Sequence, residues 1–108
     1  MEDALTYNDV LLVPQYSDIK SRSEVSLASS LSLTEFELPI IASPMDTISE
    51  SAMAVAMGQQ GGLAIIHRYN SIGEQRLHCD KAILAGFIVG AAIGTSGDYL
   101  ERASALYE

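Results

Sequence analysis

Ser43, Pro44 and Met45 lie at the carboxyl end of a predicted strand, where βα units bind ligands. The stretch PIIASPMDT opens as an apolar run of strand length, passes through this corner and closes on Asp46 and Thr47, which are explained as helix N-terminal residues. In βα units, ligands bind where the loop leaves the carboxyl end of the strand. The three residues are therefore candidate ligand contacts. The alternative is a plain corner in which Met45 fills a gap in the core.

His67 and Arg68 follow a second apolar run, LAII, and occupy the equivalent place in the next unit. A lone histidine after a strand is more often a structural residue, and no second metal ligand stands at a suitable spacing. Both interpretations of His67 stay open. Arg68 is either a contact for a ligand phosphate or a solvated loop charge.

Other polar residues form weaker patterns. Cys79 and the neighbouring His78 fall inside a predicted helix with no partner at catalytic spacing. Ser21 and Arg22 lie in a polar stretch that reads most simply as a surface turn. The glycines of VGAAIGTSG do not form GxGxxG, so we expect them to permit tight packing and a loop after the third strand.

A repeat of 24 residues positions these candidates. Three apolar runs begin at Pro39, Leu63 and Phe87, and each is followed by a hydroxyl residue with an acid three positions later. This spacing is typical of a capping box. The pattern therefore predicts three capped helices, over residues 49–59, 72–84 and 99–107. The capping pairs are Thr47 with Glu50, Ser71 with Glu74, and Thr95 with Asp98.

Three consecutive βα units predict parallel strands with right-handed crossovers. A leader over residues 1–38 precedes them, with extended segments at 5–13 and a half-buried strand at 25–33. Helices on one face of three strands leave the other face bare, whereas parallel sheets are covered on both faces or closed into a barrel. We therefore expect this 108-residue chain to be a fragment or a piece of a larger assembly.

The net charge of −8 excludes a basic nucleic-acid-binding surface. No apolar run approaches the roughly 20 residues of a membrane span, and the acidic start MEDALTYND has no secretory signal pattern. One cysteine excludes an intramolecular disulfide. These features favour a cytoplasmic protein without nucleic-acid or membrane partners.

The sequence closely resembles the amino-terminal part of the IMP dehydrogenase/GMP reductase family. The stretches that carry the resemblance are LTYNDVLLVPQYS, SRSEVSL, LPIIASPMDTISESAMAVAMGQQGGLAIIH, NSIGEQ and VGAAIGT…LERASAL. They cover nearly the whole chain, and SPMDT followed by GGLAIIH is highly specific. The resemblance implies an α/β fold that is part of a (β/α)8 TIM barrel, with the leader and first three units over residues 39–108.

Many IMP dehydrogenases insert a pair of CBS domains between the second helix and third strand, and the short join at residues 75–87 has no room for them. SPMDTISESAMA and VGAAIGT…LERA resemble the dehydrogenase, whereas SRSEV and the basic residue after His67 resemble the reductase. The closest resemblance is therefore to an IMP dehydrogenase that lacks the insert.

The implied reaction is oxidation of IMP to XMP with NAD, through a thioimidate on a cysteine in a loop like GxGSxCTT. That loop is not in this sequence and Cys79 does not match it, so we expect no catalytic residue and no activity from this chain alone. A potassium site is possible by resemblance but falls outside this chain.

The resemblance also implies roles for the candidate residues. The corner formed by Ser43, Pro44 and Met45 would line the IMP pocket. Cofactor contacts would come from His67, Arg68 and, across a subunit boundary, Ser21 and Arg22. Family barrels commonly associate as homotetramers.

Three alternatives stay open. The chain can belong to a GMP reductase, which converts GMP to IMP with NADPH, so that NADP replaces NAD. It can be a non-catalytic truncated barrel that binds nucleotide or a full-length homologue. It can also be an unrelated doubly wound α/β domain, in which the strand order would reverse instead of placing the three units side by side.

Overall fold

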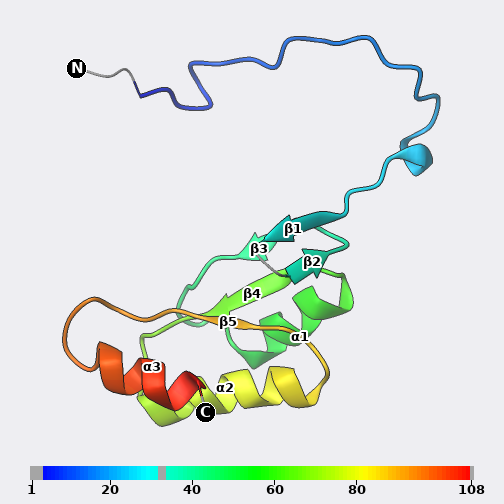
Figure 1. The fold of residues 1–108 in the computed structure, drawn as a ribbon. Helices are drawn as coiled ribbons and strands as arrows, with labels where there is room; N and C mark the ends of the chain where they lie inside the picture. The colour runs from blue at the N-terminus through cyan, green and yellow to red at the C-terminus, as the bar shows by residue number, and fades with distance from the viewer. Residues whose placement is uncertain (1–3, 32–33, 108) are drawn as a thin grey trace.

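A computed structural model describes residues 4–31 and 34–107. It begins with an exposed leader that runs away from the rest of the chain and contains one 3-10 turn, η1 (Arg22–Glu24) (Figure 1). A short antiparallel hairpin follows, made of β1 (Ser29–Leu31) and β2 (Thr34–Phe36). The hairpin separates the leader from the three βα units.

The three units form a parallel sheet of β3 (Ile41–Ala42), β4 (Leu63–Ile66) and β5 (Gly90–Ala91). The strand order is β3-β4-β5, so consecutive strands are neighbours and the order does not reverse. This arrangement confirms the α/β class and the side-by-side units, and it argues against the doubly wound alternative. The closed barrel stays a prediction.

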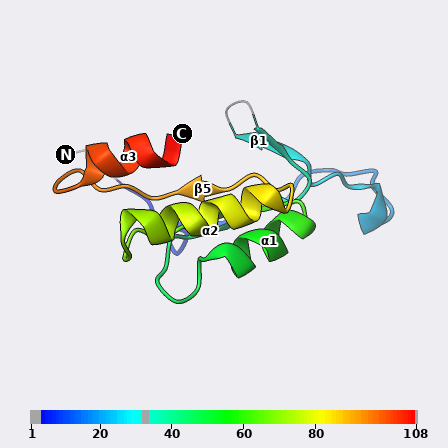
Figure 2. The same ribbon diagram turned by 90° about the horizontal axis from the view of Figure 1, so that it is seen from below.

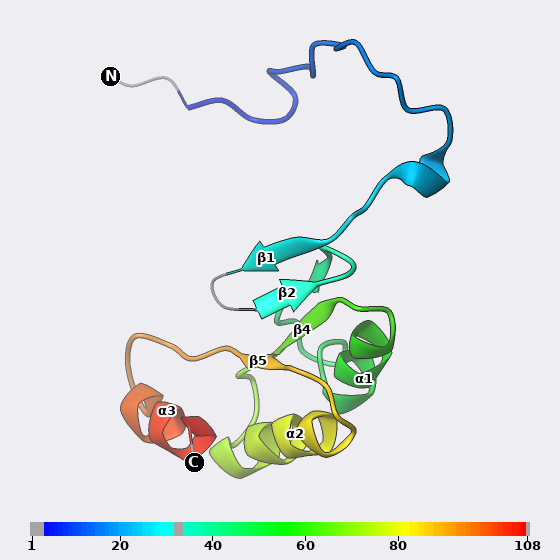
Figure 3. The ribbon, with the colours of Figure 1, turned by 45° about the vertical axis from the view of Figure 1, so that its right-hand side comes forward.

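Helices α1 (Ser51–Gln59), α2 (Ile72–Leu84) and α3 (Tyr99–Tyr107) follow the three strands in turn. Figure 3 shows the helices below the hairpin, with the strands between them, and Figure 2 shows α2 running along β5 with α1 and α3 on either side. No helix among the described residues has the length and apolar character needed to cross a membrane.

The core lies between the sheet and the helices. Because side chains alternate along a strand, Ala64 and Ile66 of β4 face the helices and pack with residues of α1 and α2. The cluster is Ala54, Ala64, Ile66, Cys79 and Ala82. On the other face, Ile41 and Ile88 remain 46% and 61% exposed. This is the bare face that the sequence predicts.

The predicted capping box is correct at α2. The Ser71 hydroxyl accepts a hydrogen bond from the Glu74 amide at 3.2 Å, and the Glu74 carboxylate accepts one from the Ser71 amide at 3.0 Å. These local bonds satisfy two amides that a helix start otherwise leaves unpaired. The helix accordingly has the predicted bounds.

The Thr47–Glu50 capping box is wrong. α1 begins at Ser51, with Glu50 at the N-cap position and no side-chain cap, and the predicted start at residue 49 is two residues early. The Ile48 and Ser49 amides donate to the Met45 carbonyl, so this stretch is a turn, and Thr47 has φ of 59°. Because these amides are hydrogen-bonded within the turn, no helix begins directly after Thr47, and its hydroxyl does not act as an N-cap.

The other differences are smaller. α3 has the predicted bounds, but the Asp98 carboxylate binds Arg102 one turn into the helix, a contact that the capping pattern does not predict. In the leader, the half-buried strand predicted over 25–33 is an exposed β1 only, and residues 32–33 of that prediction lie outside the described residues. The extended segment predicted at 5–13 contains a turn closed by Thr6 and Asp9. The leader lacks the burial that would hold a longer strand.

The close packing predicted for the third-strand glycines is confirmed at Gly90. A Cβ added there would lie 3.6 Å from Cγ1 of Ile65 and closer still to the end of that side chain. Glycine lets the neighbouring strand's isoleucine lie across β5.

Candidate functional site

The corner after β3 is a hydrogen-bonded turn. Ser49 is fully buried, its hydroxyl donates to the Ser43 carbonyl, and its amide donates to the Met45 carbonyl at 2.9 Å. These bonds fix the backbone while the Met45 side chain stays 51% exposed. Met45 therefore does not fill the core of this chain, and its polarizable side chain is available at the carboxyl end of the strand.

His67 lies at the equivalent end of β4 and is 3% exposed. Its amide donates to the Ser49 carbonyl at 3.3 Å, which ties it to the corner after β3. Its ring Nδ1 accepts a hydrogen bond from the Tyr69 amide at 3.1 Å, and Nε2 lies 3.4 Å from the Glu50 carboxylate. Both ring nitrogens have partners, as the structural interpretation of this histidine requires.

A hollow of about 330 Å³ lies beside this histidine at the carboxyl ends of β3 and β4. Polar side chains dominate its lining, and three of them are carboxylates. The lining residues are Asp46, Thr47, Glu50, His67, Tyr69, Asn70, Glu74 and His78. Neutral imidazole donors and carboxylate acceptors suit hydroxyl groups better than phosphate.

The next two side chains turn outward. Arg68 is exposed, and its guanidinium lies 5.6 Å from the centre of the Tyr69 ring, in a cation–π contact. The Tyr69 ring in turn stacks on the His67 ring with centroids 6.3 Å apart. A Cβ on Gly94 would lie 3.1 Å from an Arg68 nitrogen, so the arginine also reaches the loop after β5. The structure thus brings together the loops after β4 and β5 around the Arg68 cation, next to the Tyr69 ring.

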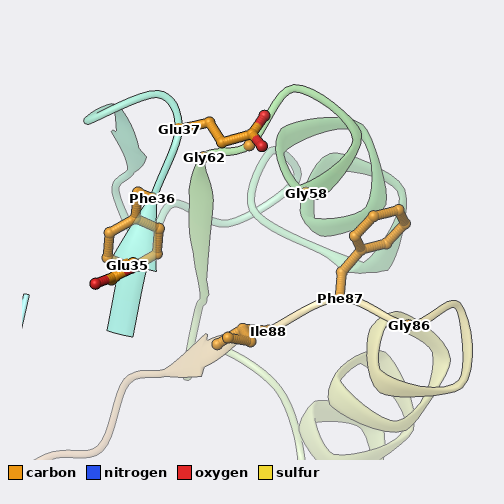
Figure 4. A pocket seen from close by; sticks show the side chains of 9 residues that line it. Glu35, Phe36, Glu37, Gly58, Gly62, Gly86, Phe87 and Ile88 are labelled. Atoms are coloured by element: carbon orange, nitrogen blue, oxygen red, sulfur yellow. The ribbon is translucent and has the colours of Figure 1, made fainter. Parts of the chain in front are cut away.

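A second hollow, of about 200 Å³, lies toward the β1–β2 hairpin and the start of β4 (Figure 4). Phe36 and Ile88 line it, together with Phe87 and the glycines that end α1. It lies at the amino end of the strands, whereas ligands of βα units bind at the carboxyl end. We therefore assign the candidate site to the hollow beside His67.

A buried arginine, Arg102, forms hydrogen bonds with residues next to the candidate site. Arg102 of α3 is 6% exposed and donates to the Gln75 side chain at 2.8 Å, to the Asn70 carbonyl at 3.0 Å and to the Asp98 carboxylate at 2.7 Å. Gln75 donates in turn to the Ala92 carbonyl at 2.8 Å. Hydrogen bonding to Arg102 holds the pKa of Asp98 below its ordinary value. The network joins the loops after β4 and β5.

Sequence reasoning missed this network. The Asp98–Arg102 spacing is the i,i+4 pattern of a helical ion pair and was available as a signal. Arg102 and Gln75 are 27 residues apart in the sequence, and no local sequence pattern predicts their contact.

Ser21 and Arg22 lie in the leader, away from the strand ends (Figure 1). The Ser21 hydroxyl accepts a hydrogen bond from the Ser23 amide at 3.3 Å, so the serine caps η1. The Ser21 amide donates to the Glu24 carboxylate at 3.0 Å, and Arg22 is exposed. Within this chain the two residues do not meet His67 and Arg68. A contact across a subunit boundary stays a prediction.

Cys79 is buried in the core, and burial raises the pKa of its thiol. This environment disfavours a nucleophile. The sequence offers His78 no partner at catalytic spacing; in the structure its Nδ1 lies 3.2 Å from the Ser51 hydroxyl and its Nε2 lies 3.9 Å from the Glu50 carboxylate. No cluster of ligating side chains within residues 4–31 and 34–107 could hold a metal.

Comparison with known proteins gives a consistent result. A sequence model of the IMP dehydrogenase / GMP reductase domain matches residues 4–108. The inosine-5'-monophosphate dehydrogenase of Nitrosopumilus maritimus is 51% identical over 89 residues, which is 82% of this chain and 19% of that protein. The Bacillus subtilis enzyme of the same name is 47% identical, over 74% of this chain and 16% of its own.

A GMP reductase of Leishmania donovani is 46% identical, over 69% of this chain and 15% of that protein. The chain therefore spans less than a fifth of the length of these relatives. The match nonetheless covers almost every residue of the chain itself. The chain belongs to the IMP dehydrogenase / GMP reductase domain family.

Proposed function

We propose that this chain forms part of the nucleotide site of an IMP dehydrogenase, a cytoplasmic oxidoreductase that oxidises IMP to XMP with NAD in guanine nucleotide biosynthesis. The observation that carries the proposal is the meeting of two strand ends. The rigid corner with its exposed Met45 lies against His67, through the bond from the His67 amide to Ser49. The 51% identity to the Nitrosopumilus dehydrogenase supports this activity before the reductase.

The complete protein would be a (β/α)8 barrel in which this chain supplies the leader and the first three units. The consecutive parallel order β3-β4-β5 suits such a barrel. Its further strands would cover the apolar face on which Ile41 and Ile88 are exposed. Homotetramers of the barrel would bring a neighbour's Ser21 and Arg22 to the cofactor.

Each candidate residue then has a role. The Met45 side chain packs against the purine, and Ser43 and Pro44 form the turn that presents it. The substrate is held with its C2 toward the reacting cysteine, which belongs to a loop that this chain does not contain. Cys79 cannot replace that cysteine, because it is buried behind the sheet.

The residues beside His67 fit one end of a dinucleotide. Arg68 and Tyr69 expose a cation and a flat ring, which suit a phosphate and a base. The carboxylates of the hollow would repel phosphate but accept ribose hydroxyls. NAD, when bound, would accept the hydride that leaves C2 of IMP. The chain's own residues would bind and orient the dinucleotide, and none transfers a proton.

GMP reductase is the second candidate. The 46% identity to the Leishmania GMP reductase supports it, and so does the exposed Arg68, whose guanidinium suits the extra phosphate of NADP. In this case the same corner would bind GMP, and NADPH, when bound, would supply the hydride that replaces the amino group at C2, which leaves as ammonia.

A chimera tests the choice. The matched segment is replaced by this chain in the Nitrosopumilus dehydrogenase and, separately, in the Leishmania donovani GMP reductase, and each purified protein is assayed with IMP plus NAD and with GMP plus NADPH. We expect NADH to form from IMP, and the isolated chain to produce none. Oxidation of NADPH with GMP alone would favour the reductase. A correctly folded, inactive chimera would support the non-catalytic alternative.

A further inference from the structure

Glu50 occupies the N-cap of α1, yet its side chain does not cap the helix. An N-cap side chain normally accepts a hydrogen bond from an amide of the first turn. Here the carboxylate turns instead toward two histidines, with Oε1 3.4 Å from Nε2 of His67 and 3.9 Å from Nε2 of His78. Because the carboxylate faces His67 at the end of β4, it does not cap the helix.

The other ring nitrogens show which protons face the carboxylate. Nδ1 of His67 accepts from the Tyr69 amide at 3.1 Å, and Nδ1 of His78 accepts from the Ser51 amide at 3.3 Å. A neutral imidazole that accepts at Nδ1 carries its proton on Nε2. Both Nε2–H groups therefore point toward the same Glu50 oxygen.

The three side chains come from three different elements. Glu50 precedes α1, His67 follows β4, and His78 lies in the second turn of α2. His67 is 3% exposed, and Glu50 is the acceptor that faces its Nε2–H. Removing the Glu50 carboxylate would therefore take the acceptor away from a buried donor. Of the other two carboxylates of the hollow, that of Glu74 is engaged in the cap of α2 through Ser71.

We propose that Glu50 is a positioning residue, whose carboxylate accepts the Nε2–H of His67 and thereby fixes the ring and the His67–Tyr69 turn. The importance of that turn for cofactor binding rests on the proposed function. The positioning itself does not, because the contact between Glu50 and His67 lies within the chain and needs no ligand.

The test is nuclear magnetic resonance on the 108-residue chain without nucleotide. In the unaltered chain at neutral pH, the ring ¹⁵N signals of His67 and His78 should each show a protonated Nε2 and an unprotonated Nδ1. The opposite tautomer at His67 would overturn the proposal without any variant.

Hydrogen exchange of the Tyr69 amide then reports the role of the carboxylate. In E50A we expect this amide to exchange roughly tenfold faster, which is the effect of losing about one net hydrogen bond. E50Q keeps an acceptor oxygen and should restore slow exchange. E74A removes a different carboxylate of the same hollow and should leave the His67 ring signals unchanged.

Unchanged Tyr69 exchange in E50A would overturn the proposal, and so would equal effects of E50A and E74A. If E50A does not fold, fast exchange in E50Q would overturn it as well. No readout involves nucleotide, so an inactive chimera would refute the proposed function while leaving these results in force.

Discussion

Arg102 offers the sharpest test of how the loops at the candidate site are held. Its guanidinium is buried beneath the ends of β4 and β5 and donates to the Gln75 side chain, the Asn70 carbonyl and the Asp98 carboxylate. Arg102→Met keeps much of the side-chain bulk and removes every donor. The substitution therefore isolates the hydrogen bonds from the packing.

The cost follows from the partners left behind. Gln75 is fully buried, and an unsatisfied buried acceptor costs about 1–3 kcal/mol. The lost bond to the Asn70 carbonyl adds about 1 kcal/mol. The Asp98 side chain is half exposed, so water can solvate its carboxylate once the arginine is lost. The free energy of unfolding should fall by about 2–4 kcal/mol.

Urea unfolding followed by circular dichroism measures this difference. One fixed chain concentration is needed, because self-association through the apolar sheet face would make the midpoint depend on concentration. Lys81→Met is the control, because Lys81 is exposed on α2 and its replacement by methionine removes a cation without removing a buried donor. Equal midpoints for R102M and K81M would refute the reasoning.

The free energy of unfolding of R102M should also depend on pH differently from that of the unaltered chain. The bond to Arg102 lowers the pKa of Asp98 below its ordinary value of 3.8. Its stabilisation is therefore complete above that value and is lost as the pH falls through the lowered pKa. R102M should lack this component, so its loss of stability on acidification should be smaller than that of the unaltered chain. A parallel pH dependence would contradict the assigned cause.

Three further predictions concern the supporting helices. Ser71→Ala removes the hydroxyl of the α2 capping box and should lower the free energy of unfolding by about 1 kcal/mol in urea titrations, with Ser71→Asp restoring most of it. Cys79 is buried with a raised thiol pKa, so Ellman's reagent should label it far more slowly in the folded chain than in denaturant; equal rates would place it at the surface. Gly58→Val places a Cβ 2.7 Å from Cβ of Phe87 and should cost about 2 kcal/mol by calorimetry, partly relieved by Phe87→Ala.

The sequence predicts best what local bonds decide. The bounds of α2 are correct because Ser71 and Glu74 cap its start, and Gly86 with φ of 88° follows its end. The 24-residue register likewise predicts three units in order, because each apolar run must pair with its neighbour. β4 begins at the predicted residue for this reason.

Contacts between distant residues are what the sequence does not reveal. Arg102 meets Gln75, and His78 meets Ser51, across 27 residues in each case. The Thr47–Glu50 pair shows the limit of a local pattern, since it has the same spacing as Ser71 and Glu74. Its amides serve the turn after β3 instead, and Glu50 faces His67. Tertiary hydrogen bonds decided between two equally good local patterns.

The central claim is that the corner after β3 forms a wall of the purine site. The most direct test is to measure the KM for IMP after Met45 is replaced in the active chimera. Met45→Ala removes an exposed side chain and should leave the fold intact. Loss of its contact with the purine should raise the KM for IMP roughly tenfold, as about 1.5 kcal/mol of burial implies. Leu84→Ala, at the exposed end of α2, is the control and should leave KM unchanged. An unchanged KM for IMP in M45A, with the chimera active, would contradict the claim.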